Sequence, residues 1–181
     1  QAEGGMDLVP SDAVEACIAQ MNGAFAPAAQ GGQNDDLAAD ALATLECFTT
    51  EIDADPDDAV AYTYRGWTLA LLARQIDGVA TAEQVASFVQ RSQSDLAEAR
   101  ALAPRYPDAL TFSAIVAVWT TDVDAAEDYL AQIDALPLPA NAPILASVNQ
   151  MLRPLVRAAT EEPASSTTEA ATDAPATSSS P

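Results

Sequence analysis

The sequence predicts an all-α fold of about seven helices, arranged as three helical hairpins and one C-terminal capping helix. Apolar residues recur at helical spacing along most of the chain, and no stretch shows the alternation of a β-strand. Several helical segments run into a proline, which ends a helix. A proline-led segment also recurs, since Pro56 falls on Pro104 after a shift of 104 − 56 = 48 residues. Repeated, proline-terminated helices indicate stacked helical hairpins.

The composition bounds the size of the fold and the class of partner. A chain of 181 residues with 49% hydrophobic content can bury one good core, so we expect one folded unit at 11–160. It has seven arginines, no lysine and no histidine, against 27 acidic residues, and its net charge is −20. Such a surface repels phosphate backbones and anionic lipid headgroups, so we expect no nucleic acid and no peripheral membrane binding. A second interpretation of the acidity is a solubility trait of the source.

The side chains needed for most enzyme mechanisms are missing from the sequence. Without histidine the chain lacks the commonest general base and metal ligand, and without lysine it cannot form a Schiff base. It also has no CxxCH motif for attached haem. The clustered acids lie at predicted helix starts, where capping explains them: Asp55, Asp57 and Asp58, and Asp122 with Asp124. We therefore expect no catalytic residue, no cofactor and no metal site.

The two ends of the sequence differ from its middle. Residues 1–10 are polar and contain glycine, as in a linker. In 161–181, nine of the 21 residues are Ser or Thr and three are Pro, which predicts a disordered tail; O-glycosylation of that tail is an alternative to an idle extension. No run of about twenty apolar residues is present to span a membrane. Because the chain starts at Gln1, we expect either a processed product that has lost a signal or anchor, or a cloning choice.

The first hairpin is predicted from two helices joined by the loop PAAQGGQND. The first helix should start at Ser11 or Asp12, since Asp12 and Glu15 have capping-box spacing, and it should fray near Asn22–Gly23 or end by Pro27. The second should cover 35–54. The inward side chains should be Val14, Cys17, Ile18 and Met21 on the first helix, and Leu42, Leu45, Phe48 and Ile52 on the second.

The stretch DPDDAVAYTYRGWTLALLAR, residues 55–74, predicts the third helix. Asp55 is a suitable N-cap, and Pro56 suits the first helical position because its missing N–H costs nothing there. Tyr62, Gly66 and Leu69 recur at i, i+4 and i+7, which marks a packing line. Since Gly66 has no side chain, another helix could approach closely at that point.

Caps and prolines also mark the later helices. Thr81 with Gln84 predicts a capping box that opens a long fourth helix running to Leu102. The fifth helix should run from Pro107–Asp108 to about Trp119–Thr120. The sixth, about 124–135, should pack through Ala126, Leu130 and Ile133 before Pro137 and Pro139 stop it.

A last helix is predicted at 142–160, with Asn141 as its cap and Pro154 as a candidate bend. It should cover the open end of the stack with Ile144, Leu145, Val148, Leu152 and Leu155.

The repeated unit resembles the tetratricopeptide repeat. The 48-residue shift places Tyr64 on Phe112 and Gly66 on Ala114, whereas the usual period is about 34 residues. The excess, 48 − 34 = 14, is assigned to an insertion, QIDGVATAEQVASF, after Arg74. More narrowly, AYTYRGW followed by ARALAPRYPDAL resembles the extracytoplasmic repeat domain of membrane-anchored actinobacterial cytochrome c biogenesis factors. The resemblance implies a right-handed solenoid outside the cytoplasm, anchored by a missing N-terminal segment.

Cys17 and Cys47 form a candidate disulfide. They sit 13 and 17 residues from Gln30 along antiparallel arms, so they could reach similar heights on facing helices. The alternative is two buried free thiols in a reducing compartment. The resemblance favours the bond, because it places the domain outside the cytoplasm.

Repeat hairpins bind peptides or partner helices in a groove lined by their first helices. Off the packing line, the groove residues should be Thr63, Trp67, Leu71, Thr111, Ile115 and Trp119. Trp67 and Trp119 fall on equivalent faces, where exposed tryptophans anchor a partner well. In the alternative, one or both tryptophans belong to the core.

The sequence is compatible with two functions. One is a non-catalytic extracytoplasmic module that holds a polypeptide client or membrane assembly partner, linked by resemblance to cytochrome c maturation. The other is a structural accessory or spacer of an envelope complex with no client groove. An exposed apolar groove favours the first, and a groove filled by the insertion favours the second.

Overall fold

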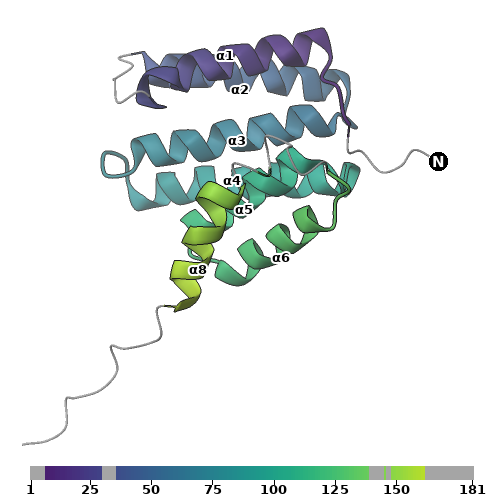
Figure 1. The fold of residues 1–181 in the computed structure, drawn as a ribbon. Helices are drawn as coiled ribbons and strands as arrows, with labels where there is room; N and C mark the ends of the chain where they lie inside the picture. Colours follow the sequence, from purple (N-terminus) through teal and green to yellow (C-terminus); the bar gives the residue numbers. More distant parts are fainter. Residues whose placement is uncertain (1–6, 30–35, 139–144, 146–147, 162–181) are drawn as a thin grey trace, which may run out of the picture.

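The computed structural model describes residues 7–29, 36–138, 145 and 148–161, and in these ranges all regular structure is helical (Figure 1). The prediction of an all-α fold is confirmed. The helices, in chain order, are α1 Asp12–Ala29, α2 Leu37–Ala54, α3 Ala59–Ile76, α4 Ala82–Leu102, α5 Pro107–Trp119, α6 Val123–Asp134, the π-helix η1 Val148–Leu152 and α8 Arg153–Glu161.

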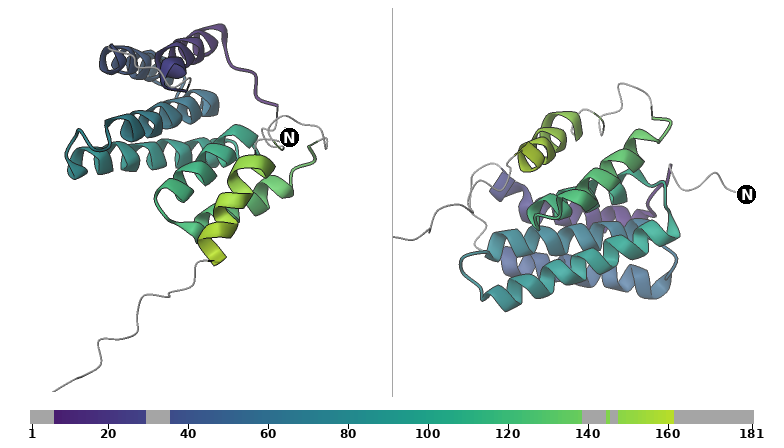
Figure 2. Two further views of the ribbon diagram at one scale, coloured as in Figure 1. Left: turned by 60° about the vertical axis from the view of Figure 1, so that its left-hand side comes forward. Right: turned by 90° about the horizontal axis from the view of Figure 1, so that it is seen from below.

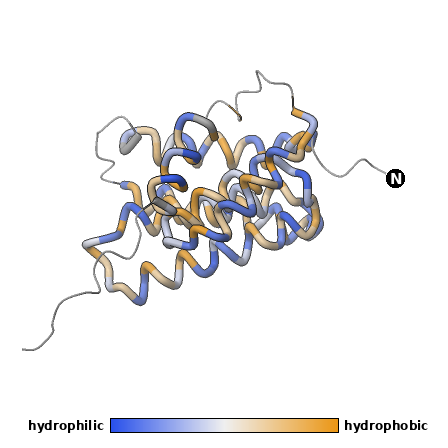
Figure 3. Tube along the Cα trace, turned by 60° about the horizontal axis from the view of Figure 1, so that its bottom comes forward, coloured by the Kyte–Doolittle hydropathy of each residue, from blue (hydrophilic) through white to orange (hydrophobic). Residues whose placement is uncertain are grey.

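Successive helices pack as neighbours. The most extensive contacts join α3 with α4 and α5 with α6, followed equally by α1 with α2 and α2 with α3, and α3 also contacts α1 and α5 (Figures 1 and 2). The last helix, α8, packs on α6 at the far end of the stack from α1. Hydrophobic and hydrophilic stretches alternate along much of the chain (Figure 3), as expected when one side of a helix faces a core. One core cluster draws mainly on α1, α2 and α3, and another on α5, α6, η1 and α8.

The first hairpin follows its prediction except at the C-terminal end of α1. Ser11, one of the two predicted starts, caps α1, because its Oγ accepts the Val14 N–H at 3.1 Å. The helix continues through Gly23 and Pro27 to Ala29, so the expected end by Pro27 was too early. Residues 30–35 of the expected loop lie outside the described residues.

The buried face of α2 is displaced from the predicted one by part of a turn. Leu45, Phe48 and Ile52 are buried as predicted, but the Leu42 side chain is 61% exposed. Ala41 and Thr44 are buried beside them instead. The small side chains let α2 lie close to its neighbours, and Leu42 is left at the edge of the contact face.

The third helix begins three residues later than predicted. Asp58, not Asp55, is its N-cap, because Asp58 Oδ1 accepts the N–H groups of Val60 at 2.8 Å and Ala61 at 2.9 Å. Asp55 instead ends α2, since its N–H donates to the Glu51 carbonyl at 2.8 Å. Its carboxylate accepts the Asp57 N–H at 3.2 Å, which folds the Asp-Pro-Asp sequence into a turn between the helices.

The predicted close approach at Gly66 is confirmed. A Cβ atom built on Gly66 would lie 3.1 Å from the Ser92 carbonyl oxygen and 3.0 Å from Leu96 Cγ, both on α4. Next to this contact, Arg65 binds Asp95 through two hydrogen bonds, Nε to Oδ2 and Nη2 to Oδ1, each 2.8 Å. A glycine and a bidentate ion pair therefore fix α3 against α4 at one level.

The assigned insertion, residues 75–88, lengthens this hairpin instead of forming an element of its own. It supplies the end of α3, a turn in which Gly78 has φ +85°, and the first turns of α4. The capping box of Thr81 and Gln84 is confirmed, with both of its hydrogen bonds formed. The predicted limits of α5 and the buried Ala126, Leu130 and Ile133 of α6 also agree with the structure.

The C-terminal helix is interrupted where it was expected to be continuous. Its first part, with Asn141 and Ile144, lies outside the described residues, as does the tail from 162. In the described part, η1 comes immediately before α8, whose second residue is Pro154. The wider π-turn moves the inward face by one residue, so Val156 is buried while the predicted Leu155 is 49% exposed.

Candidate functional site

A hollow of about 460 Å³ lies between α1 and α3. Its lining is mostly apolar and consists of Met21, Asn22, Phe25, Ala26, Trp67, Leu71 and Gln75. Met21 and Phe25 are 4% and 7% exposed and belong to the core, so they form a firm wall. Asn22 and Gln75 are exposed at the rim, and Trp67 and Leu71 are half-buried. The hollow therefore has an apolar interior and an uncharged polar rim.

Trp67 is one member of an aromatic stack that joins α3 to α5. Its ring lies 4.5 Å from the Phe112 ring at an interplanar angle of 9°, and 5.4 Å from the Trp119 ring at 24°. Tyr64 meets Phe112 edge-on at 5.6 Å and 79°. The predicted equivalence of the two tryptophans thus brings their rings into contact, and both are half-buried. Trp67 therefore belongs both to the aromatic stack and to the lining of the hollow.

The other predicted groove residues lie away from the hollow. Thr63 is fully buried, and its hydroxyl donates to the Ala59 carbonyl at 2.7 Å. Thr111 is 7% exposed, and Ile115 packs on the core cluster of α5, α6 and η1. These positions are covered because α3 contacts four other helices and η1 packs on α5. Of the six predicted residues, Trp67 and Leu71 line the hollow.

Several lining residues were not anticipated, and they come mainly from α1. Phe25 and Ala26 follow Gly23, in the stretch where the helix was expected to fray, so no inward face was assigned there. Phe112 did carry a signal, because the 48-residue shift places it on Tyr64, another aromatic residue. Glycine and proline near a helix end did not terminate α1, since its apolar face is held by packing.

A polar cluster lies beside the aromatic stack. Asp108 Oδ2 accepts hydrogen bonds from the hydroxyls of Tyr64 at 2.7 Å and Tyr106 at 3.2 Å. Burial, followed by the charge of Asp108, raises the pKa of both phenols above the usual 10.0. Both hydroxyls therefore stay protonated as donors, and the cluster links α3 to α5 without supplying a nucleophile.

The stack ends at a cation. The Arg74 guanidinium carbon lies 4.8 Å from the centroid of the Trp119 ring, a cation–π contact at the C-terminal end of α3. Arg74 is exposed, and it does not line the hollow between α1 and α3.

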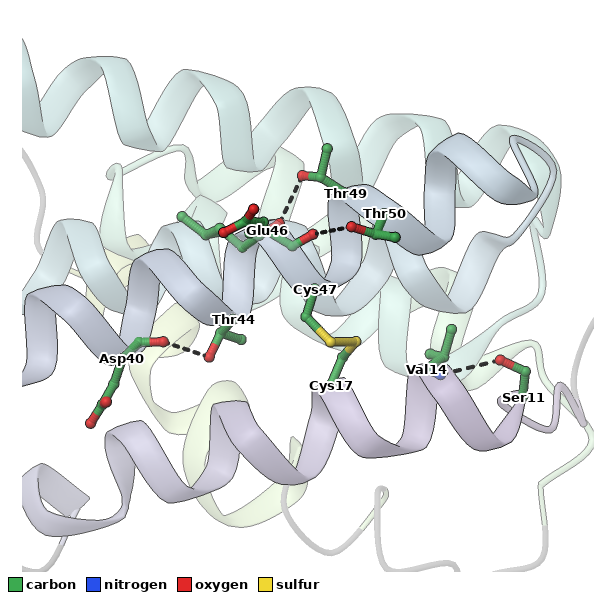
Figure 4. Close-up of a disulfide and its surroundings, with 10 residues drawn as sticks. Ser11, Val14, Cys17, Asp40, Thr44, Glu46, Cys47, Thr49 and Thr50 are labelled. Carbon is green, nitrogen blue, oxygen red and sulfur yellow. Dashed lines mark hydrogen bonds between the residues drawn. A yellow bond between two sulfur atoms is a disulfide. The ribbon is translucent and has the colours of Figure 1, made fainter.

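The wall that α1 contributes to the hollow is held by the predicted pair of cysteines. Cys17 and Cys47 are at disulfide distance, with their Cα atoms 5.7 Å apart (Figure 4). Cys17 is buried one turn before Met21, so the bond fixes α1 on α2 close to the hollow. The geometric expectation for this pair is confirmed.

The described ranges contain neither a cluster of metal-binding side chains nor a helix that could span a membrane. No group of three or more His, Cys, Asp or Glu side chains is placed there to hold a metal ion. Among the same residues, none of the helices combines the length and the apolar character required to cross a bilayer.

Comparisons with known proteins give no match: no family model fits the chain, and neither a curated protein nor a solved structure is significantly similar to it.

Proposed function

We propose that this chain is a non-catalytic protein-binding module, a right-handed tetratricopeptide-like stack of hairpins that receives an apolar side chain of a polypeptide partner. The observation that carries the proposal is the hollow between α1 and α3. Its volume of about 460 Å³ falls in the usual range for binding clefts, about 300–1,000 Å³. Large, rigid side chains such as Trp67 and Phe25 give contact area at little entropic cost.

The charge of the chain indicates which polypeptide fits. The net charge is −20 and the rim residues Asn22 and Gln75 are neutral. A segment with one apolar anchor flanked by Arg or Lys is therefore complementary to the hollow and to the acidic field around it. The occupant we propose is such a basic peptide or helix of a partner protein.

The location that we propose is outside the cytoplasm, with the chain held at the membrane by a segment N-terminal to it. The Cys17–Cys47 pair supports an oxidising compartment. The link to cytochrome c maturation rests on the sequence resemblance, and in that role the protein would act on polypeptide and not on haem.

A second function is favoured by a specific observation. Thr63 of α3 and Thr111 of α5 are buried, and Ile115 of α5 packs against a core cluster, so these parts of the expected groove are closed. A structural accessory subunit or spacer needs a well-packed stack and no client groove. The two functions differ in whether the hollow binds anything.

The test uses a phage-displayed random peptide library panned against the whole protein. Enriched peptides are synthesised and titrated by tryptophan fluorescence, since Trp67 lines the hollow. They should share an apolar residue flanked by Arg or Lys, and Asn22→Arg should weaken binding about tenfold by placing a positive charge at the rim.

The matched control is Gln20→Arg, which adds the same charge at an exposed position of the same helix outside the hollow. This variant should bind the peptides as the unmodified protein does. If no peptide is enriched, or if both variants bind equally well, the binding module is rejected and the spacer is retained.

A further inference from the structure

A second and smaller pocket, about 110 Å³, lies among α4, α5 and α6. It shares no residue with the hollow between α1 and α3. Its polar lining consists of Gln93, Arg100, Ser113, Asp122 and Tyr129. The remaining wall is formed by small or branched apolar side chains, which keep the pocket narrow.

Arg100 is the unusual member of this lining. Its Nη1 donates to Ser113 Oγ, and its guanidinium carbon lies 4.6 Å from the centroid of the Tyr129 ring. Ser113 Oγ in turn donates to the Ala109 carbonyl at 2.6 Å, so it has a single proton and acts toward Arg100 as an acceptor. Both partners of this half-buried cation are uncharged.

The contrast with Arg65 shows what is missing. Arg65, which is also half-buried, has two hydrogen bonds to Asp95, and this hydrogen bonding raises the pKa of Arg65. Burial, the larger effect, lowers the pKa of Arg100, and Tyr129 acts in the opposite direction. A buried cation is costly unless it is paired, and acids outnumber arginines 27 to 7 in this chain. The chain therefore has many acids that could pair with Arg100, but none of those described forms an ion pair with it.

We propose that this pocket binds a small monocarboxylate, which supplies the missing partner of Arg100. A guanidinium has five N–H donors in a planar fork, and the bond to Ser113 uses one of them. Two of the others can be taken by the oxygens of a carboxylate, and Ser113 positions the fork. The volume of about 110 Å³ limits the ligand to a few heavy atoms.

Asp122 restricts the class of ligand further. It lines the same pocket, and its Oδ1 accepts the Ala125 N–H at 3.2 Å as the N-cap of α6. A carboxylate on the wall repels a second negative charge, so a singly charged acid is favoured over a dianion such as sulfate.

The experiment follows the arginine Nε–H signals of the whole protein in ¹H–¹⁵N spectra. The seven arginines give few signals, and triple-resonance spectra of the unmodified protein identify the one from Arg100. Sodium acetate should shift this signal saturably, sodium chloride at equal ionic strength should not, and sodium sulfate should bind more weakly than acetate. The Arg100→Lys variant keeps the charge but loses the fork and its Nε–H signal, so acetate binding to it is followed on the backbone amide signal of Ser113, and it should be at least about tenfold weaker.

Arg91→Lys is the matched control, because Arg91 lies exposed on the same helix outside the pocket. It should leave acetate binding unchanged. No saturable shift, a chloride effect equal to that of acetate, sulfate binding as tight as acetate, or full binding by Arg100→Lys would each overturn the proposal. The titration of the unmodified protein decides the first three outcomes even if Arg100→Lys does not fold.

Discussion

Gly66 of α3 lies so close to Leu96 of α4 that a Cβ atom on the glycine would be 3.0 Å from Leu96 Cγ. The Ser92 carbonyl oxygen is equally close at 3.1 Å, and a backbone atom cannot rotate away. We expect Gly66→Ala to force α3 and α4 apart and to destabilise the protein by about 1–3 kcal/mol. Thermal unfolding should show a melting temperature several degrees lower.

Gly23→Ala is the control for this change. Gly23 lies inside α1, and a Cβ there would meet nothing within 4 Å. Alanine in a helix is favoured over glycine by about 0.5–1 kcal/mol, so this variant should melt at the same or a higher temperature. Equal effects of the two substitutions would remove the close approach as the explanation.

Reduction of Cys17–Cys47 should weaken the first hairpin. The bond closes a loop with a sequence separation of 30, for which the chain-entropy model gives about 3–4 kcal/mol. Protein made in an oxidising compartment should gain the mass of two hydrogens on reduction, and its urea midpoint should fall. An unchanged intact mass after reduction would show that the cysteines are free.

A double substitution separates the stability lost with the disulfide from the stability lost by changing the side chains. The double substitution Cys17→Ser, Cys47→Ser should unfold at the same urea concentration as the reduced protein, apart from the penalty of placing a hydroxyl at the buried position 17. Reductant should then have no further effect on the variant.

The contact between Trp67 and Trp119 should be visible by circular dichroism. Two indole rings 5.4 Å apart couple their transitions, and Trp119→Phe should remove the resulting signal while keeping an apolar ring in place. Trp67→Ala removes contacts with both Phe112 and Trp119, so we expect a loss of about 2–4 kcal/mol in stability. A thermal stability unchanged by Trp67→Ala would contradict the stack.

Alkaline pH should destabilise the fold through Tyr64 and Tyr106. Burial and Asp108 raise both folded pKa values above 10.0, the unfolded value, so their contribution is fully present below pH 10.0. Above that pH the unfolded chain loses these protons while the fold retains them, and stability falls as the pH rises toward the folded pKa values. Urea unfolding on either side of pH 10.0 measures the slope.

Tyr106→Phe should reduce this dependence on pH, because one of the two raised groups is gone. The variant loses the hydrogen bond to Asp108 at every pH, so the slope and not the absolute stability is the relevant quantity. A slope identical to that of the unmodified protein would show that Tyr106 does not contribute.

Much of the fold could be read from the sequence because its signals are local. The capping box at Thr81, the start of α5 at Pro107 and the small residue at Gly66 act over a few residues, and the structure agrees at each of them. The placement of Cys17 against Cys47 needed only a count along two antiparallel arms. Where two local signals competed, as at Asp55 and Asp58, the chain used the second, because the first ends α2.

The site is different, because the exposure of a side chain depends on how many helices pack around its own. Trp67 and Leu71 line the hollow, whereas Thr63, on the same side of α3, is buried by the neighbours of that helix.

By itself, the sequence determined which stretches form helices, the capping box at Thr81, and that Cys17 and Cys47 can reach similar heights on neighbouring helices, since hydrogen bonds and periodicity are fixed by near neighbours. Only the tertiary structure decided that Phe25 completes the hollow and that Trp67 stacks on Phe112. It also decided that Arg100 contacts Ser113 and Tyr129 and, within the described part of the chain, forms no ion pair with a carboxylate. These contacts join residues that are distant along the chain, and the angle and rotation of each packed helix, which set such contacts, arise from the sum of many weak packing interactions.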